Sequence, residues 1–200
     1  MSEKRVATYK DVLEAPEHMV AELIDGELFL SPRPGPAHAS VTSLLLTELG
    51  PRFSQGGRGA GGWLILVEPE LHLGKRVLVP DLAGWRTSRM ATVPDRAYIT
   101  LAPDWICETA SPSTEKLDRR RKLPIYARAG VEYAWLVSPR LKTLEVFRAH
   151  GRKWLLVDTF SDRDRIRAVP FKTFELQLSR LWRNLPLRVS EGSDLWVSPY

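Results

Sequence analysis

The feature that most constrains the fold of this chain is a strand, a helix and a further strand in succession between residues 104 and 139. "DWICETA" (104–110) has the apolar pattern of a strand, yet it carries Asp104 and Glu108. A helix is predicted over 114–129, where Gly130 is placed to end it. "EYAWLVSP" (132–139) follows as the most apolar strand of the chain.

Hairpins and helices are predicted on either side of this unit. A short helix is expected over 8–15 with Thr8 as N-cap, and a hairpin over 19–32 around Asp25-Gly26. A helix over 36–53 is expected to end at Gly50-Pro51. A second hairpin spans 63–86 with Gly74-Lys75 at its turn. Strands are expected over 143–150 and 153–160, a helix or strand over 171–185, and a surface loop over 54–62. This order predicts an α/β fold with a mixed, largely antiparallel sheet.

Size and composition favour one globular domain. The 200 residues suit a domain over 1–185 followed by a tail over 186–200. Cys107 is the only cysteine, so an intramolecular disulfide and a cysteine-rich zinc site are excluded. The start of the chain lacks the apolar core of a secretory signal. No apolar run approaches the roughly 20 residues that are needed to span a bilayer. A cytoplasmic protein is expected. The net charge of +5 mildly favours an anionic partner.

Two acids in apolar strands suggest a metal site. Alternation along 104–110 sets Glu108 on one face with Ile106, and Cys107 on the other. Burying a lone carboxylate is costly unless it is paired, protonated or bound to a metal. Asp81 is a second such acid, in "VLVPDLAGW" (77–85). Two carboxylates from adjacent strands can hold Mg²⁺, which prefers oxygen ligands and keeps several waters.

Other polar residues have simpler interpretations. Asp104 follows Pro103 and is interpreted as a strand-entry residue, and Cys107 as a buried apolar residue. Ser111 and Ser113 lack the context of a hydrolase nucleophile and are interpreted as turn and cap residues. The cations of 119–121 could contact a phosphate backbone or simply be solvated.

Six short motifs, in order, resemble the Uma-two family over roughly residues 8–150. These motifs are "ELIDGELFLSP", His38 at the start of a helix, "VPDLAGW", "APDWICETASPST", the set Asp118, Lys122 and Tyr126, and "GVEYAWLVSP". The family is described as restriction-endonuclease-like, of the PD-(D/E)XK type. The resemblance implies a central mixed sheet flanked by helices and Mg²⁺-dependent (or Mn²⁺-dependent) phosphodiester hydrolysis. It places the PD aspartate on Asp81 and the (D/E) glutamate on Glu108.

The chain departs from the superfamily pattern at the lysine. That position falls on Ala110, so the resemblance implies a lysine on the following helix, Lys122, with Lys116 as the weaker candidate. Pro124 removes a backbone donor. It is tolerable if the regular helix restarts near Leu123, with Pro124 in its first turn.

Two further residues and two functions remain open. Glu22 matches the N-terminal glutamate of the family and could reach the metal or orient a water, or could be an ordinary strand residue. His38 could contact phosphate or carry a proton, or simply be a polar residue in the first helical turn. The sequence predicts a Mg²⁺-dependent nuclease acting on nucleic acid, with DNA as the expected substrate. The alternative is a non-catalytic nucleic-acid-binding or protein-interaction module. Exposed edge strands would suit a homodimer.

Overall fold

The computed structural model describes residues 5–54 and 62–186, and its centre is a six-stranded sheet. The strand order is β10-β9-β8-β7-β6-β3, and of these pairs only β7 and β8 are parallel. A mixed, largely antiparallel sheet is therefore confirmed. The strands are β3 (Trp63–Val67), β6 (Leu82–Arg86), β7 (Trp105–Thr109), β8 (Tyr133–Ser138), β9 (Thr143–His150) and β10 (Lys153–Ser161).

The predicted strand, helix and strand form the crossover that joins β7 to β8. Parallel strands need such a connection because a tight turn joins only antiparallel strands, and the chain has to return to the end of the sheet where the first strand began. The helical segment is irregular, with α3 (Glu115–Leu117), a π-helical turn (Asp118–Lys122) and α4 (Leu123–Ala129). The Leu123 N–H bonds to the Asp118 carbonyl, five residues back. Pro124 lies in the first turn of α4, as expected, and Gly130, at φ 90°, ends the helix.

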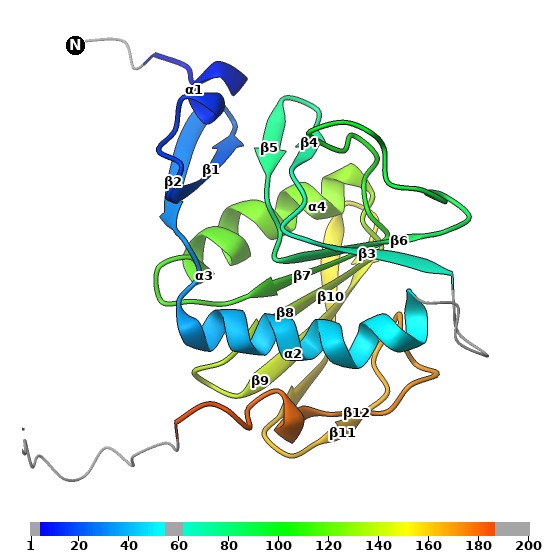
Figure 1. Cartoon of the computed structure of the whole chain (residues 1–200). Helices are drawn as coiled ribbons and strands as arrows, with labels where there is room; N and C mark the ends of the chain where they lie inside the picture. The colour runs from blue at the N-terminus through cyan, green and yellow to red at the C-terminus, as the bar shows by residue number, and fades with distance from the viewer. Residues whose placement is uncertain (1–4, 55–61, 187–200) are drawn as a thin grey trace, which may run out of the picture.

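The two faces of the sheet are covered by different helices (Figure 1). Helix α2 (Pro36–Phe53) packs its apolar side on the face that carries Trp105 and Cys107. Helix α4 packs Leu123, Ile125 and Tyr126 on the face that carries Ile106. The predicted alternation along 104–110 is thus confirmed, and Cys107 is a core residue.

Helix α2 continues past its predicted end. The sequence places that end at Gly50-Pro51, whereas the helix runs to Phe53. Pro51 removes one helical hydrogen bond, but Ser54 N–H still bonds to the Gly50 carbonyl at 2.9 Å. Phe53 is buried against Phe171. Burial of that ring offsets the cost of the missing bond.

A smaller, four-stranded sheet stands beside the crossover helix. Its order is β2-β1-β5-β4, with β1 (Met19–Ile24), β2 (Glu27–Pro32), β4 (Leu71–Leu73) and β5 (Arg76–Leu78). The hairpin at Asp25-Gly26 is confirmed, and both turn residues have positive φ, as a primed turn requires.

The hairpin predicted over 63–86 is confirmed, but it is divided between the two sheets. Its inner strands β4 and β5 turn at Gly74-Lys75 in the small sheet, while its outer strands β3 and β6 pair in the large sheet. Pro69 and Pro80 lie where the chain passes between the sheets. Because proline lacks an N–H, it interrupts a continuous ladder. Asp81 therefore lies just before β6, whereas the sequence predicted that it lies within a strand.

The ends of the described chain are built from short elements. The predicted helix near the N-terminus is α1 (Tyr9–Leu13), with Thr8 at its N-cap. The segment predicted as helix or strand over 171–185 contains only β12 (Leu176–Gln177), paired with β11 (Arg165–Ile166), and a 3₁₀ turn, η2 (Leu178–Arg180). Most of the predicted loop and tail, residues 55–61 and 187–200, lie outside the described residues. No helix in the described ranges is both long and apolar enough to cross a membrane.

Candidate active site

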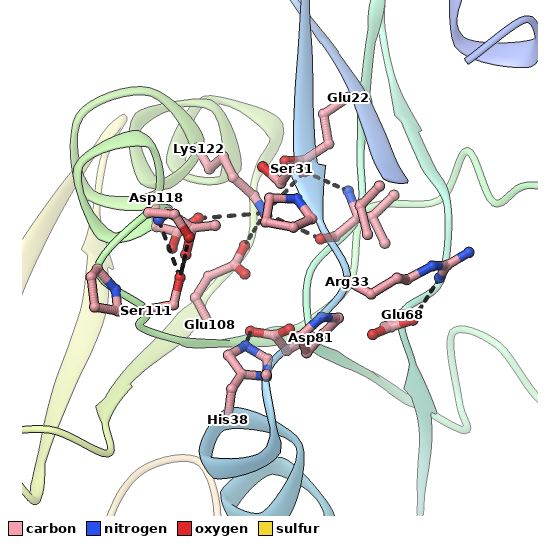
Figure 2. Close-up of a pocket in the computed structure, with 18 residues that line it drawn as sticks. Glu22, Ser31, Arg33, His38, Glu68, Asp81, Glu108, Ser111, Asp118 and Lys122 are labelled. Carbon is pink, nitrogen blue, oxygen red and sulfur yellow. Dashed lines mark hydrogen bonds and ion pairs between the residues drawn. The ribbon is translucent and has the colours of Figure 1, made fainter. Parts of the chain in front are cut away.

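A pocket of about 360 Å³ opens where the small sheet, the start of α2 and the crossover meet (Figure 2). It is lined by acids from five segments of the chain, by two permanent cations and by one histidine. These charged and titratable residues are Glu22, Glu68, Asp81, Glu108, Asp118, Arg33, Lys122 and His38. The carboxylates outnumber the cations, so the pocket is suited to bind further positive charge.

The crossover brings Lys122 and Tyr126 to Glu108. Glu108 points to the face of the sheet that the crossover helix covers, and residues four apart lie on one side of a helix. Lys122 Nζ lies 3.0 Å from Glu108 Oε1, and the Tyr126 hydroxyl donates to the same oxygen at 2.8 Å. The strand acid and the helical lysine that the sequence singles out are therefore an ion pair.

Glu22 reaches the same lysine from β1. Its Oε1 lies 2.9 Å from Lys122 Nζ and accepts the Val79 N–H at 2.8 Å. Lys122 Nζ also donates to the Val79 carbonyl at 3.1 Å, and Asp118 lies farther away at 3.6 Å. An ammonium has three protons, so three close partners hold Lys122 in one position.

Burial shifts the protonation of this cluster. Burial raises the pKa of Glu108 well above its ordinary range, although Lys122 opposes the shift. Burial alone would lower the pKa of Lys122, but the carboxylates of Glu108 and Glu22 outweigh it and raise that pKa well above its usual value. The lysine thus stays charged, while Glu108 holds its proton more tightly than an exposed glutamate. A further cation beside Glu108 would favour its ionised form.

Asp81 lies at the opposite wall, held by β7 and α2. Leu82 pairs with Cys107, so the same register continued by one residue sets Asp81 opposite Glu108. Asp81 Oδ2 accepts the Thr109 N–H at 2.6 Å and lies 3.1 Å from His38 Nε2. One turn along α2, the Thr42 hydroxyl bonds to that of Thr109 at 2.8 Å. The Thr109 N–H and His38 thus hold Asp81 Oδ2 in place, and Thr42 holds Thr109.

His38 is a partner of Asp81 and not an isolated polar residue. An ionised aspartate only accepts, so Nε2 carries the proton of this hydrogen bond. Burial, the largest single cause, lowers the pKa of His38, but the hydrogen bond to Asp81 and the charges of Asp81, Asp118 and Glu68 together outweigh burial and raise it. The structure thus places His38 in the site, where it orients Asp81 from the first turns of α2.

Comparison with known proteins identifies the family. The model of the Uma2 family, described as "Putative restriction endonuclease", matches residues 6–180. The chain belongs to the Uma2 family. Family membership confirms the resemblance that the sequence motifs indicate, and it makes the chain a restriction-endonuclease-like protein.

A solved structure supports the same fold. The chain is similar to a crystal structure described as "a putative nuclease belonging to DUF820" from Anabaena variabilis, with a TM-score of 0.69 and 20% identity. The match covers 88% of this chain and 98% of that chain. The restriction-endonuclease-like α/β fold is thus confirmed. A search of curated proteins finds no match.

The acids of this Uma2 site suit a hydrated cation better than a closed metal cage. Within the described residues, no three His, Cys, Asp or Glu side chains are arranged to hold a metal ion. Mg²⁺, however, is commonly held by one or two carboxylates and keeps several waters. Hydrogen bonds of the described part of the chain engage Asp81 Oδ2 and Glu108 Oε1, and none engages Asp81 Oδ1 or Glu108 Oε2. These two oxygens are therefore the ones that could bind such an ion.

The other predicted residues lie outside the ion-pair cluster or have structural partners. Lys116 is exposed on α3 and does not line the pocket. Asp104 accepts the Arg86 N–H at 2.8 Å and pairs with Arg89 at 2.9 Å, which fits its interpretation as a strand-entry residue. Ser111 accepts the Thr114 N–H at 3.2 Å in the turn before α3, as expected of a turn residue, whereas the N-cap of α3 is Thr114.

The basic cluster 119–121 is partly neutralised. Arg119 bridges Glu115 and Glu145, and Arg121 lies 3.4 Å from Glu27. Arg120 is exposed. The cluster as a whole is therefore not a free basic patch.

Sequence reasoning gave no role to Asp118 and did not find Arg33 or Glu68. Asp118 stands four residues before Lys122, and this spacing is a signal that could have predicted their contact. Arg33 and Glu68 lie 3.7 Å apart at the pocket and come from distant segments. No local pattern in the sequence brings those two residues together.

Asp118 should make stability depend on pH between about 4 and 6. Burial, the largest cause, raises the pKa of Asp118 to about 6, although Lys122 opposes the shift. The folded state then keeps a proton that the unfolded chain has lost, so stability falls as pH rises through this window. Asp118→Asn should remove that fall and raise the relative stability above pH 6. Urea unfolding at pH 4, 5, 6 and 8 checks this, and parallel pH profiles for both proteins would contradict it.

Proposed function

We propose that this protein is a Mg²⁺-dependent endonuclease that hydrolyses phosphodiester bonds of nucleic acid, with DNA as the expected substrate. One observation carries the proposal. Asp81, just before β6, and Glu108, on the neighbouring strand β7, face one pocket, each with an oxygen that the internal hydrogen bonds leave open. Family membership supports the same reaction class.

The proposal gives each side chain a separate role. Asp81 and Glu108 would hold the cation, whose bound water supplies the nucleophile and whose charge offsets that of the phosphoryl oxygens. Lys122 keeps Glu108 and Glu22 in place and supplies the positive charge nearest to them. His38 and the Thr109 N–H orient Asp81. Glu22 faces the pocket from the side opposite Asp81 and would orient a water.

The complete set of side chains favours the enzyme over the non-catalytic alternative. A binding module would have no use for a buried lysine that joins two glutamates at the wall of a polar pocket. Buried ion pairs are often no more stabilising than apolar residues of similar size. Their presence in the pocket therefore supports a chemical role.

Cleavage under single-turnover conditions tests the function. We expect the wild type to cut supercoiled plasmid DNA, and with lower preference a labelled RNA, in Mg²⁺ or Mn²⁺ but not in EDTA. Lys116→Ala is the matched control, since this lysine lies six residues from Lys122 but outside the pocket. It should cut at the wild-type rate. Failure to cut either nucleic acid in any divalent cation would favour the non-catalytic alternative.

Substrate binding should be salt-dependent and should involve Arg33. Arg33 lines the pocket, donates to the Glu17 carbonyl at 3.1 Å and lies 3.7 Å from Glu68. Its side chain is 58% exposed, so it can turn to a phosphate. Each phosphate contact contributes about 0.9 to the slope of log K against log salt concentration. Arg33→Gln should reduce that slope by about one contact. Fluorescence anisotropy in EDTA measures it, with the exposed Arg163→Gln as control; affinity that does not change with salt would contradict the expectation.

A further inference from the structure

The free edge of the large sheet is an exposed strand with a run of aliphatic side chains. β10 ends the strand order, and its inner side pairs with β9. Leu155, Leu156 and Val157 are 59%, 50% and 48% exposed. Other large exposed aliphatics of the described residues are scattered singly, as on most protein surfaces. Three in succession on an edge strand are unusual and form a surface that suits a partner.

The geometry favours a partner that extends the sheet. Leu155 pairs with Arg148 and Leu156 with Phe147 on β9, so these two neighbours point to opposite faces of the sheet. A helix or a loop that docked on one face would cover only one of them. A strand added to the edge would flank both and would also bond the outward backbone groups, which an edge leaves without a partner strand.

The charges along β10 are self-complementary. The strand begins at the exposed cation Lys153, directly after the exposed Arg152, and carries the exposed acid Asp158 near its far end, with Asp162 just beyond. An antiparallel neighbour reverses this order, so the cationic start of one strand faces the acidic end of the other. A two-fold axis makes each such contact twice. The same surface therefore fits a second copy of this chain.

We propose that β10 is a homodimer interface, in which two copies pair antiparallel through this strand and join their sheets into one. The proposal is independent of the nuclease function. It also gives a physical reason for leaving the edge unblocked. Edge strands usually carry prolines or inward-pointing charged residues that prevent pairing with another strand. Residues 154–160 contain no proline and only one charged residue, Asp158.

Sedimentation equilibrium tests the interface. The mass of the wild type should rise from the 22.7 kDa of one chain toward twice that value as the concentration increases from about 1 to 100 µM, the range over which a micromolar complex associates. Leu156→Lys should raise the dissociation constant by about tenfold or more, since it places a charge at the centre of the interface. Val67→Lys is the control, because Val67 is 52% exposed at the opposite edge of the same sheet. It should leave the mass unchanged.

Charge reversal distinguishes antiparallel pairing of two copies from nonspecific association. Lys153→Glu and Asp158→Lys should each weaken the dimer, and the double variant should regain it. Both residues are exposed, so the variants should keep the circular dichroism spectrum and melting temperature of the wild type. A wild type that is monomeric throughout would overturn the proposal and would mean that the bulge between Leu156 and Asp158 closes the edge. A dimer that survives Leu156→Lys would overturn it as well.

Discussion

Lys122→Met is expected to reduce both stability and cleavage, each by a large amount. The ammonium lies 2.9 Å from Glu22 and 3.0 Å from Glu108, and all three side chains are buried. Removing one partner of a buried pair leaves uncompensated charge and typically costs about 3–5 kcal/mol. Removing one preorganised charge from an active site costs about 100- to 1000-fold in rate. Urea unfolding and single-turnover cleavage measure the two effects.

A second variant separates the two effects of Lys122. Lys122→Met combined with Glu22→Gln removes one of the unpaired acids, so part of the lost stability should return. Cleavage should stay low because the cation is still missing. Lys116→Met, on the exposed side of α3, should change neither quantity. A stable Lys122→Met protein that cuts at the wild-type rate would contradict the role of this lysine.

Glu108→Gln is expected to abolish cleavage while leaving the fold intact. The amide has nearly the same shape, and its oxygen can still accept the Tyr126 hydroxyl proton. Lys122 keeps Glu22, Asp118 and the Val79 carbonyl as partners. Because a neutral amide binds divalent cations far less well than a carboxylate, the rate should fall by about 100-fold or more.

The pH dependence of stability provides a further check on Glu108. Burial, which is the largest cause, raises the pKa of this carboxyl group in the folded state. Ionisation of Glu108 therefore lowers stability as pH rises through the folded pKa, and the glutamine removes this loss. Glu108→Gln should gain stability relative to wild type as the pH increases. A variant that unfolds more readily than wild type at pH 8 would mean that the carboxylate is needed for folding.

Local patterns in the sequence correctly predicted those elements whose structure is determined by a few neighbouring residues. The Asp25-Gly26 hairpin has the residues that its turn requires, and alternation along 104–110 correctly assigned Glu108 and Cys107 to opposite faces. The restart of the helix at Leu123 followed from Pro124 alone. These features depend on steric rules that act over a few residues.

Other features depend on contacts between distant segments. The division of 63–86 between two sheets follows from the pairing of β1 with β5, which no local pattern shows. Helix α2 continues past Pro51 because Phe53 finds a place in the core. In the site, the sequence identified Asp81, Glu108, Lys122 and Glu22 as candidates. The binding of Lys122 by both glutamates became visible only in three dimensions.

Calorimetric titration of Mn²⁺ and Mg²⁺ into the wild type, Asp81→Asn and Glu108→Gln tests most directly whether these two acids hold one cation. Glu68→Gln is the matched control, since Glu68 lines the same pocket but has no proposed part in binding. We predict one binding site in the wild type and in the control, and none in either of the other variants. Binding should also release protons, because a cation beside Glu108 lowers its raised pKa. Equal binding by all four proteins would contradict the account.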